Sequence, residues 1–480
     1  MTYPNYDALY SISDLHLGGT EGKQIFSGKL ELPALLKNLT NQHPNLRIAL
    51  VINGDFIDFL AEAPGQYFNV DSAIHKLRRV AADATFKASF AAFGDFVSAS
   101  NRFLIINLGN HDLELAFPDV QQVFAECCGL ADAHRIHWVD DGAGFRAAVG
   151  EASVLCLHGN EADVANHVDF EALRRFRKLR QLGSRKVQTS SADWTPNAGT
   201  QLVIDAMNTV KQDHPFIDVL KPETEAAVRV LLALDFDKVK QLAWPAMRAM
   251  GGRGGKDAVK HWFGILSAPQ PGEVTQIAAA KVDHAQQMLD AIEVAMNDKL
   301  EPQELLSSSD SIQQLGFTED VMLFWNSMRG KDTTNALRDA LEALDYDQSF
   351  KFDAPEKMND ALADLVGSDI NFLLSGHTHF HRSLRLGPSS QHFNSGTWAY
   401  LMHLTEAVRT DKVKFNRLIA ALKAKKSLAE LDADEHLLKR HTVVRIAKFD
   451  ASVRGELLLA KLSKAGEFSF DAVPNSERIF

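Results

Sequence analysis

The sequence has little cysteine and no long apolar segment. Its 480 residues include only three cysteines, too few for a disulfide framework. Cys127 and Cys128 are adjacent, and Cys156 lies in an apolar run typical of a strand. No apolar run is long enough to cross a bilayer, and the first residues lack the basic and apolar regions of a signal peptide. We therefore expect reduced thiols, no membrane span and a cytoplasmic location.

The sequence also has fewer basic residues than acidic ones. The chain has 51 lysines and arginines against 62 acidic residues, a formal net charge of −11. This balance argues against a general nucleic-acid-binding protein, because such proteins neutralise phosphates with a basic surface. A local basic patch is still compatible with it, and the densest basic cluster lies between Arg174 and Lys186. A cluster of this kind is either a solvated helix face or a site that catches phosphate.

Strand-like apolar runs alternate with helix-like amphipathic segments at both ends of the chain. Helices are predicted at 33–42 and 73–100, between the first strands. Such alternation predicts an α/β fold, in which ligands bind at the carboxyl ends of the strands. The strand-like runs that matter most end at Ile12, Ile52, Leu108, Leu157 and Leu374.

The middle of the chain contains almost no strand-like run, which predicts an inserted helical cap. We therefore expect a core of 1–161 and 368–480 that is interrupted by a cap at 162–367. The second part of the core should hold helices over 403–440 and a final hairpin, and the tail after Lys464 should be a surface strap or partly disordered. Helices of the cap are predicted at 164–182, 199–211, 223–250, 256–266, 274–297, 318–329 and 333–345.

Polar side chains suited to metal binding follow each of the principal strand-like runs. They are carboxylates, imidazoles and carboxamides, a mixture that suits divalent first-row metals. Such a set can hold two divalent ions about 3.5–4 Å apart if one carboxylate bridges them. The motifs are Asp14-x-His16, Gly54-Asp55-x-x-Asp58, Gly109-Asn110-His111-Asp112, His158-Gly159-Asn160 and Gly376-His377-Thr378-His379.

These motifs, in this order, resemble those of the calcineurin-like metallophosphoesterases. The resemblance covers residues 8–161 and 369–400 and leaves out the predicted cap. It implies a double β-sandwich flanked by helices, with the site at the carboxyl ends of the strands. It also implies an enzyme that hydrolyses a phosphomonoester or phosphodiester by attack of a metal-bridging hydroxide.

The resemblance assigns a role to each residue of the motifs. It implies two divalent ions, Mn²⁺ foremost, with Fe, Zn, Co or Ni as alternatives. His111 would contact the phosphate and protonate the leaving group, Asp58 would orient His111, and Asp112 is expected to be structural. The implied metal ligands are Asp14, His16 and His379 for the first ion, Asn110, His158 and His377 for the second, and Asp55 as the bridge.

Three further functions stay open at this point. The position of the predicted cap is similar to that of the UDP-2,3-diacylglucosamine hydrolases, which cleave a nucleotide-lipid pyrophosphate. This insertion is longer, however, and His111 stands where we expect an arginine in that subfamily. The second is a nuclease on the same site, and the third is a non-catalytic scaffold, as in the retromer subunit of the same family. The sequence indicates neither the native substrate nor the oligomeric state.

Overall fold

The computed structural model divides the chain into two compact units. Unit 1 comprises Met1–Asn197, Gln348–Tyr400 and Lys439–Phe480, and unit 2 comprises Ala198–Asp347 and Leu401–Leu438. The described residues are 3–63, 68–131, 133–163, 166–183, 208–221, 333–342, 350–354, 356–424 and 426–480, with isolated positions between 196 and 234. The predicted helices 256–266, 274–297 and 318–329, and nearly all of 223–250, lie outside them. The predicted cap boundaries therefore stay a prediction.

Unit 1 contains an eight-stranded mixed sheet in which β2, β3, β4 and β5 run parallel. The order is β15-β14-β13-β2-β3-β4-β5, and β16 pairs with β14. The strands are β2 (Ala8–Ile12), β3 (Ile48–Asn53), β4 (Arg102–Asn107), β5 (Ile136–Val139), β13 (Thr442–Phe449), β14 (Ser452–Leu462), β15 (Phe468–Ala472) and β16 (Arg478–Ile479).

A six-stranded mixed sheet in the order β1-β6-β7-β9-β11-β10 forms the other half of unit 1. Its strands β7, β9 and β11 are parallel. Buried side chains of both sheets, such as Leu9, Val51, Val154 and Phe372, form one apolar cluster, so the sheets pack face to face. The strands are β1 (Asn5–Tyr6), β6 (Phe145–Val149), β7 (Ala152–Cys156), β9 (Phe372–Ser375), β10 (His381–Gly387) and β11 (Ser390–Ser395).

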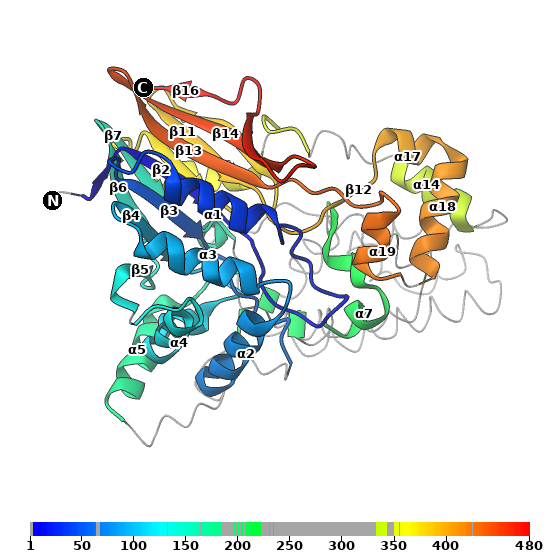
Figure 1. Cartoon of the computed structure of the whole chain (residues 1–480). Coiled ribbons are helices and arrows are strands. Elements are labelled where there is room, and N and C mark those ends of the chain that lie inside the picture. The colour runs from blue at the N-terminus through cyan, green and yellow to red at the C-terminus, as the bar shows by residue number, and fades with distance from the viewer. Residues whose placement is uncertain are drawn as a thin grey trace, which may run out of the picture. The chain divides into compact units, whose positions relative to one another are not determined.

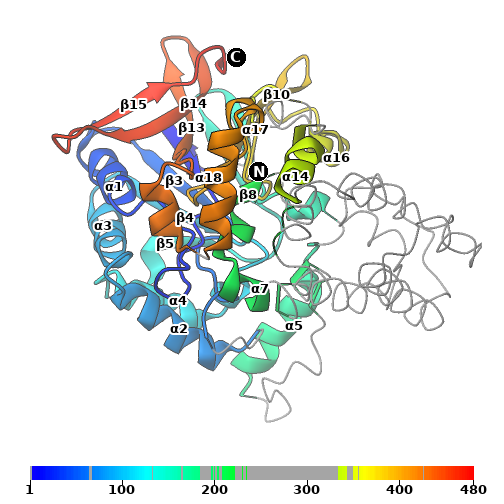
Figure 2. The ribbon, with the colours of Figure 1, turned by 90° about the vertical axis from the view of Figure 1, so that its right-hand side faces the viewer.

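Helices cover the outer face of each sheet. Side chains alternate along a strand, so Leu9 of β2 faces the other sheet while Tyr10 packs in the cluster that contains the helices. The helices of that cluster include α1 (Glu31–Asn41), α2 (Val70–Ala82), α3 (Lys87–Ser98) and α4 (Pro118–Cys127). Helices α1 and α3 lie side by side in both views (Figures 1 and 2). Over the six-stranded sheet, α16 (Lys357–Leu365) packs Leu362 against Leu157 and Leu373.

The predicted mixed α/β class is confirmed by this architecture, but two local predictions were wrong. The helix predicted at 73–100 is two helices, because Asp83 adopts an extended conformation and ends α2. The tail after Lys464 forms β15, which pairs antiparallel with β14 and stacks Phe470 on Tyr10. Short 3₁₀ helices at Leu113–Ala116, Ala133–Arg135 and Asn160–Ala162 complete unit 1 together with α5 (Phe170–Gln181).

Unit 2, as far as it is described, is mostly helical. Two short strands, β8 (Leu220–Lys221) and β12 (Met402–His403), pair parallel within it. Helices α14, α17 and α18 pack on one another. The helices are α7 (Asn208–Asp213), α14 (Thr333–Glu342), α17 (Glu406–Thr410), α18 (Lys412–Lys423) and α19 (Leu428–Ala433), with a 3₁₀ helix at Pro215–Asp218. Among all described helices of the chain, none combines the length and apolarity that a bilayer crossing requires.

Candidate metal centre

The sequence motifs lie at the carboxyl ends of parallel strands in both sheets of unit 1. The loop after β2 is bound to the loop after β3, since the Asp14 N–H donates to Gly54 O (3.1 Å) and the His16 N–H donates to Asp55 O (3.0 Å). In the other sheet, the Gly376 N–H donates to His158 O at 2.8 Å. These backbone bonds continue the strand pairing into the loops, so side chains far apart in the sequence meet at one end of the sandwich.

Five non-glycine residues in these loops have a left-handed backbone. Non-glycine residues seldom adopt positive φ, and such strain tends to concentrate at functional sites. The surrounding hydrogen bonds hold the strained loops in place and direct their polar side chains inward. The φ angles are 52° at Asp14, 47° at His16, 50° at Asp55, 71° at His377 and 63° at His379.

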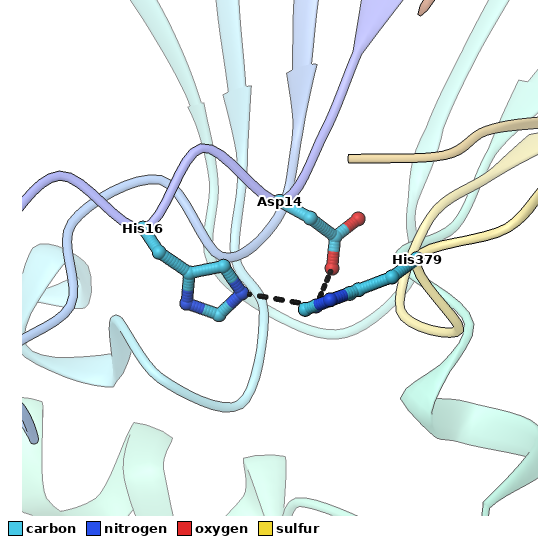
Figure 3. A group of neighbouring side chains, drawn as sticks. All are labelled: Asp14, His16 and His379. Atoms are coloured by element: carbon cyan, nitrogen blue, oxygen red, sulfur yellow. Dashed lines mark hydrogen bonds and ion pairs between the residues drawn. The ribbon is translucent and has the colours of Figure 1, made fainter. Parts of the chain in front are cut away.

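Asp14, His16 and His379 form the first group of potential metal ligands (Figure 3). Figure 3 shows the Asp14 carboxylate and the two imidazole rings meeting from the loops after β2 and β9. The distances are 3.2 Å between the Nε2 atoms of His16 and His379, and 3.4 Å from His379 Nε2 to Asp14 Oδ1. Two imidazole nitrogens that share one ion at about 2.1 Å lie about 3.0–3.4 Å apart, so this spacing fits a common metal.

Asp55, His158 and His377 form a second group of potential ligands. His158 Nε2 lies 3.4 Å from Asp55 Oδ2, and His158 Nδ1 lies 2.8 Å from Asn53 O. A metal-binding histidine usually donates its other ring N–H in this way, which leaves the facing nitrogen free to coordinate. Asn110 belongs to the same place, because the next residue, His111, donates its backbone N–H to Asp55 Oδ1 at 3.0 Å.

Two buried atoms of this second group support a cation there. Within the described part of the chain, Asn110 Oδ1 and His158 Nε2 have no hydrogen-bond partner. A buried polar atom without a partner is unfavourable by about 1–3 kcal/mol, so such atoms are rare unless an ion or a ligand satisfies them. Both atoms, an amide oxygen and an imidazole nitrogen, can coordinate a metal, and the residues present therefore fit a divalent ion.

The charges of the site also favour a cation. Burial alone would raise the pKa of Asp14 and Asp55, but neighbouring imidazoles, His379 for Asp14 and His158 for Asp55, outweigh burial and lower both pKa values. For His158, burial lowers the pKa, yet the carboxylate of Asp55 raises it to about 10. The two carboxylates thus stay ionised in a water-poor site and attract positive charge, which a divalent ion supplies.

Asp58 connects the first group of ligands to His111. Its Oδ2 lies 3.3 Å from His16 Nδ1, and its Oδ1 lies 3.3 Å from His111 Nδ1. Oδ1 also accepts the backbone N–H groups of Leu60 and Ala61, at 3.1 Å and 3.0 Å. Burial works against ionisation, but His111 and His16 hold the pKa of Asp58 well below its usual value. One fixed carboxylate therefore orients the rings of both His16 and His111. The second of these contacts is the one predicted between Asp58 and His111.

The Asp112 carboxylate joins two loops of the site. Its Oδ2 accepts the Phe56 N–H and its Oδ1 accepts the Gly109 N–H, both at 2.7 Å. Burial and the nearby Asp55 raise the pKa of Asp112 to about 7. Both oxygens of Asp112 are engaged by the backbone and its side chain is fully buried, which agrees with the expected structural role.

Gly109 has no room for a side chain. A Cβ atom at this position would overlap Asp55 Oδ1 and the Asp55 backbone nitrogen, whereas a Cβ at Gly387 would meet nothing within 4 Å. Neither glycine has a positive φ, so the two positions differ only in the room that is available for a Cβ atom. The close approach of the loop after β4 to Asp55 therefore requires glycine.

We expect Gly109→Ala to lower the free energy of unfolding by about 1–3 kcal/mol, because overpacking displaces the Asp55 loop. The metal content of the purified protein should fall with it. Gly387→Ala is the control and should change stability by less than about 0.5 kcal/mol. Urea denaturation and elemental analysis measure the two effects. Equal behaviour of the two variants would show that the Asp55 loop tolerates displacement.

Sequence reasoning missed the asparagines that tie the two sheets together at this end. Asn53 Nδ2 donates to Leu157 O (2.7 Å) and Leu374 O (3.0 Å), and Asn107 Nδ2 donates to Asn53 Oδ1 (2.9 Å). All of these atoms are buried. The signal available in the sequence was an asparagine at the last position of each of two adjacent apolar strands.

Sequence reasoning also missed Asp163. Its Oδ2 lies 2.9 Å from His377 Nε2, so a further carboxylate reaches the second group of ligands. Asp163 follows the 3₁₀ helix at Asn160–Ala162, directly after the His158 motif. Nothing in the local spacing distinguishes it from Glu161, whose carboxylate instead accepts the Gly159 N–H at 2.7 Å.

The basic cluster on α5 is largely paired with acidic side chains. Arg177 Nη1 lies 2.6 Å from Asp140 Oδ1, and Arg180 Nη2 lies 2.9 Å from both Asp71 and Asp119. These ion pairs link α5 to neighbouring elements of unit 1, which indicates a structural role for Arg177 and Arg180. Arg185 and Lys186 lie outside the described residues.

No protein-family model matches the sequence, and no curated protein is significantly similar to it. The fold and the site alone define the class: a mixed α/β protein whose buried histidine and aspartate clusters can hold a metal ion.

Proposed function

We propose that the protein is a dinuclear-metal-dependent phosphoesterase of the calcineurin-like metallophosphoesterase type. The observation that carries the proposal is the pair of adjoining ligand groups, Asp14/His16/His379 and Asp55/His158/His377, at the strand ends of two packed sheets. The two-sheet sandwich covered by helices on its outer faces is the arrangement that the sequence resemblance implies.

The proposed division of the ligands follows the two groups. Asp14, His16 and His379 would hold one ion, and Asn110, His158 and His377 the other, with Asp55 between them. When bound, two divalent ions, in our proposal Mn²⁺, lower the pKa of a coordinated water toward neutrality and withdraw charge from phosphoryl oxygens. Asp163, next to His377, would hold that ring in place or add a carboxylate to the second ion.

His111 supplies the proton in this proposal. Its ring lies edge-on to that of His16, with ring centroids 5.0 Å apart, so it borders the first group of ligands. Asp58 Oδ1 holds the Nδ1 side of the ring at 3.3 Å, so in this proposal Nε2 is the atom that donates the proton. A histidine held by a carboxylate in this way is suited to protonate a departing alkoxide.

Hydrolysis of p-nitrophenyl phosphate and of bis-p-nitrophenyl phosphate tests the proposal. We expect turnover of at least one ester with added Mn²⁺ and none after treatment with a chelator. Salt-sensitive binding and cleavage of DNA or RNA, without hydrolysis of the small esters, would favour a nuclease. A protein that takes up metal but hydrolyses neither ester with Mn, Fe, Zn, Co or Ni would contradict the proposal and favour a non-catalytic scaffold.

A further inference from the structure

A separate cavity of about 400 Å³ lies in unit 1, where the edge strand β10 approaches β14 and the end of β15. Its apolar wall includes Phe350, Phe352, Leu459 and Val473. The volume falls in the lower part of the range for small-molecule sites, which are mostly apolar with a few polar groups that fix orientation. None of the predicted metal ligands lines this cavity.

The polar wall of the cavity carries a net positive charge from Lys351 and Arg440, while burial lowers the pKa of His381 to about 3 and keeps its ring neutral. Among the lining residues, Asp353 is the single carboxylate against these two cations. Arg440 Nη1 lies 3.3 Å from Phe350 O, to which it donates, and 3.5 Å from His381 Nδ1. Within the described residues, no ion pair joins Arg440 to a carboxylate, Asp353 included.

An arginine without a carboxylate partner among the described residues is unusual at a half-buried position. The neighbouring Arg382 differs, because its Nε lies 3.7 Å from Glu356 Oε2, so its charge is offset. The guanidinium of Arg440 presents a planar set of N–H donors that matches a carboxylate or a phosphate. A ligand in the cavity can therefore supply the anion that Arg440 would bind.

We propose that this cavity binds a small amphipathic anion, with a carboxylate or phosphate-type group on Arg440 and an apolar body against Phe350, Phe352 and Leu459. Because the guanidinium and the apolar wall line the same cavity, the ligand that fits both carries an anionic group and an apolar body. A neutral apolar molecule leaves Arg440 without an anion, and a cation is repelled by Arg440 and Lys351. The proposal is independent of the metal centre.

Displacement of 8-anilino-1-naphthalenesulfonate, a fluorescent amphipathic anion, tests the proposal on the full chain. Octanoate and octylphosphonate represent the two anionic groups, and octanol and octylamine are the neutral and cationic controls. We expect saturable probe binding that at least one anion displaces, with the two controls weaker by about tenfold or more. Equal displacement by octanol, or no saturable binding, would overturn the proposal.

Two variants locate the binding. Arg440→Ala removes the cation and Ala472→Trp fills the cavity, and each should weaken binding by about 10- to 100-fold. Arg385→Ala removes an exposed arginine of β10 that does not line the cavity, and should leave binding unchanged. Thermal unfolding checks that each variant is folded. Binding that survives both cavity variants but is lost in Asp55→Asn would place the anion at the metal centre and overturn the proposal.

Discussion

Replacement of Asp55 by alanine is expected to abolish turnover and metal loading while the chain stays folded. Its Oδ2 lies 3.4 Å from His158 Nε2, and its Oδ1 accepts the His111 N–H. In the proposed site, this carboxylate is the only group shared by both ions, and its loss leaves each ion with fewer anionic ligands. Loss of several kcal/mol of charge stabilisation corresponds to a fall in turnover of about 10³-fold or more.

Elemental analysis, circular dichroism and hydrolysis of p-nitrophenyl phosphate measure these effects. Asp55→Asn is the sharper variant, because it keeps the shape and one oxygen but cannot bridge two cations as an anion. Asp95→Ala removes an exposed carboxylate of α3 and should match the wild-type protein in all assays. Wild-type turnover in either Asp55 variant would refute the bridging role, and an unfolded Asp55→Ala would move the test to Asp55→Asn.

Replacement of His111 by alanine is expected to retain the metals and lose most turnover, in a way that depends on the leaving group. General acid catalysis contributes about 10²–10⁴-fold when the leaving group is a poor one. p-Nitrophenolate leaves readily without a proton, so its ester should lose about tenfold or less. Rates with p-nitrophenyl phosphate and with an alkyl phosphate, measured at equal metal content, provide the comparison.

The same variant tests a different arrangement of the site. His16, Asp58 and His111 also lie close enough together to hold an ion. If His111 were a metal ligand, His111→Ala would lose metal and slow every ester equally, and the general-acid role would be wrong. His75→Ala, which removes an exposed histidine of α2, is the matched control. Asp58→Asn should lose part of the metal and part of the general acid catalysis, because Asp58 contacts His16 as well as His111.

The candidate site shows how far local sequence could be read. Each predicted metal ligand follows a strand, and the run before it shows the period and apolarity of a buried strand. Asp14 and His16 nevertheless do not meet by strand alternation, because both lie beyond β2 with a left-handed backbone, and hydrogen bonds from their N–H groups to the loop after β3 hold them in place. The outcome for the C-terminal tail was different, because β15 forms only by pairing with β14.

The sequence by itself determined the strand ends, the donor types gathered there and the mixed α/β class, because these depend on residues close together in the chain. Only the tertiary structure decided that Asp163 reaches His377, that Asn53 links both sheets, and that Arg177 is paired with Asp140. The tertiary structure also placed Arg440 beside His381 in a cavity that none of the predicted metal ligands lines. Each of these contacts joins side chains from different elements, and no local pattern encodes which distant partner a polar group will meet.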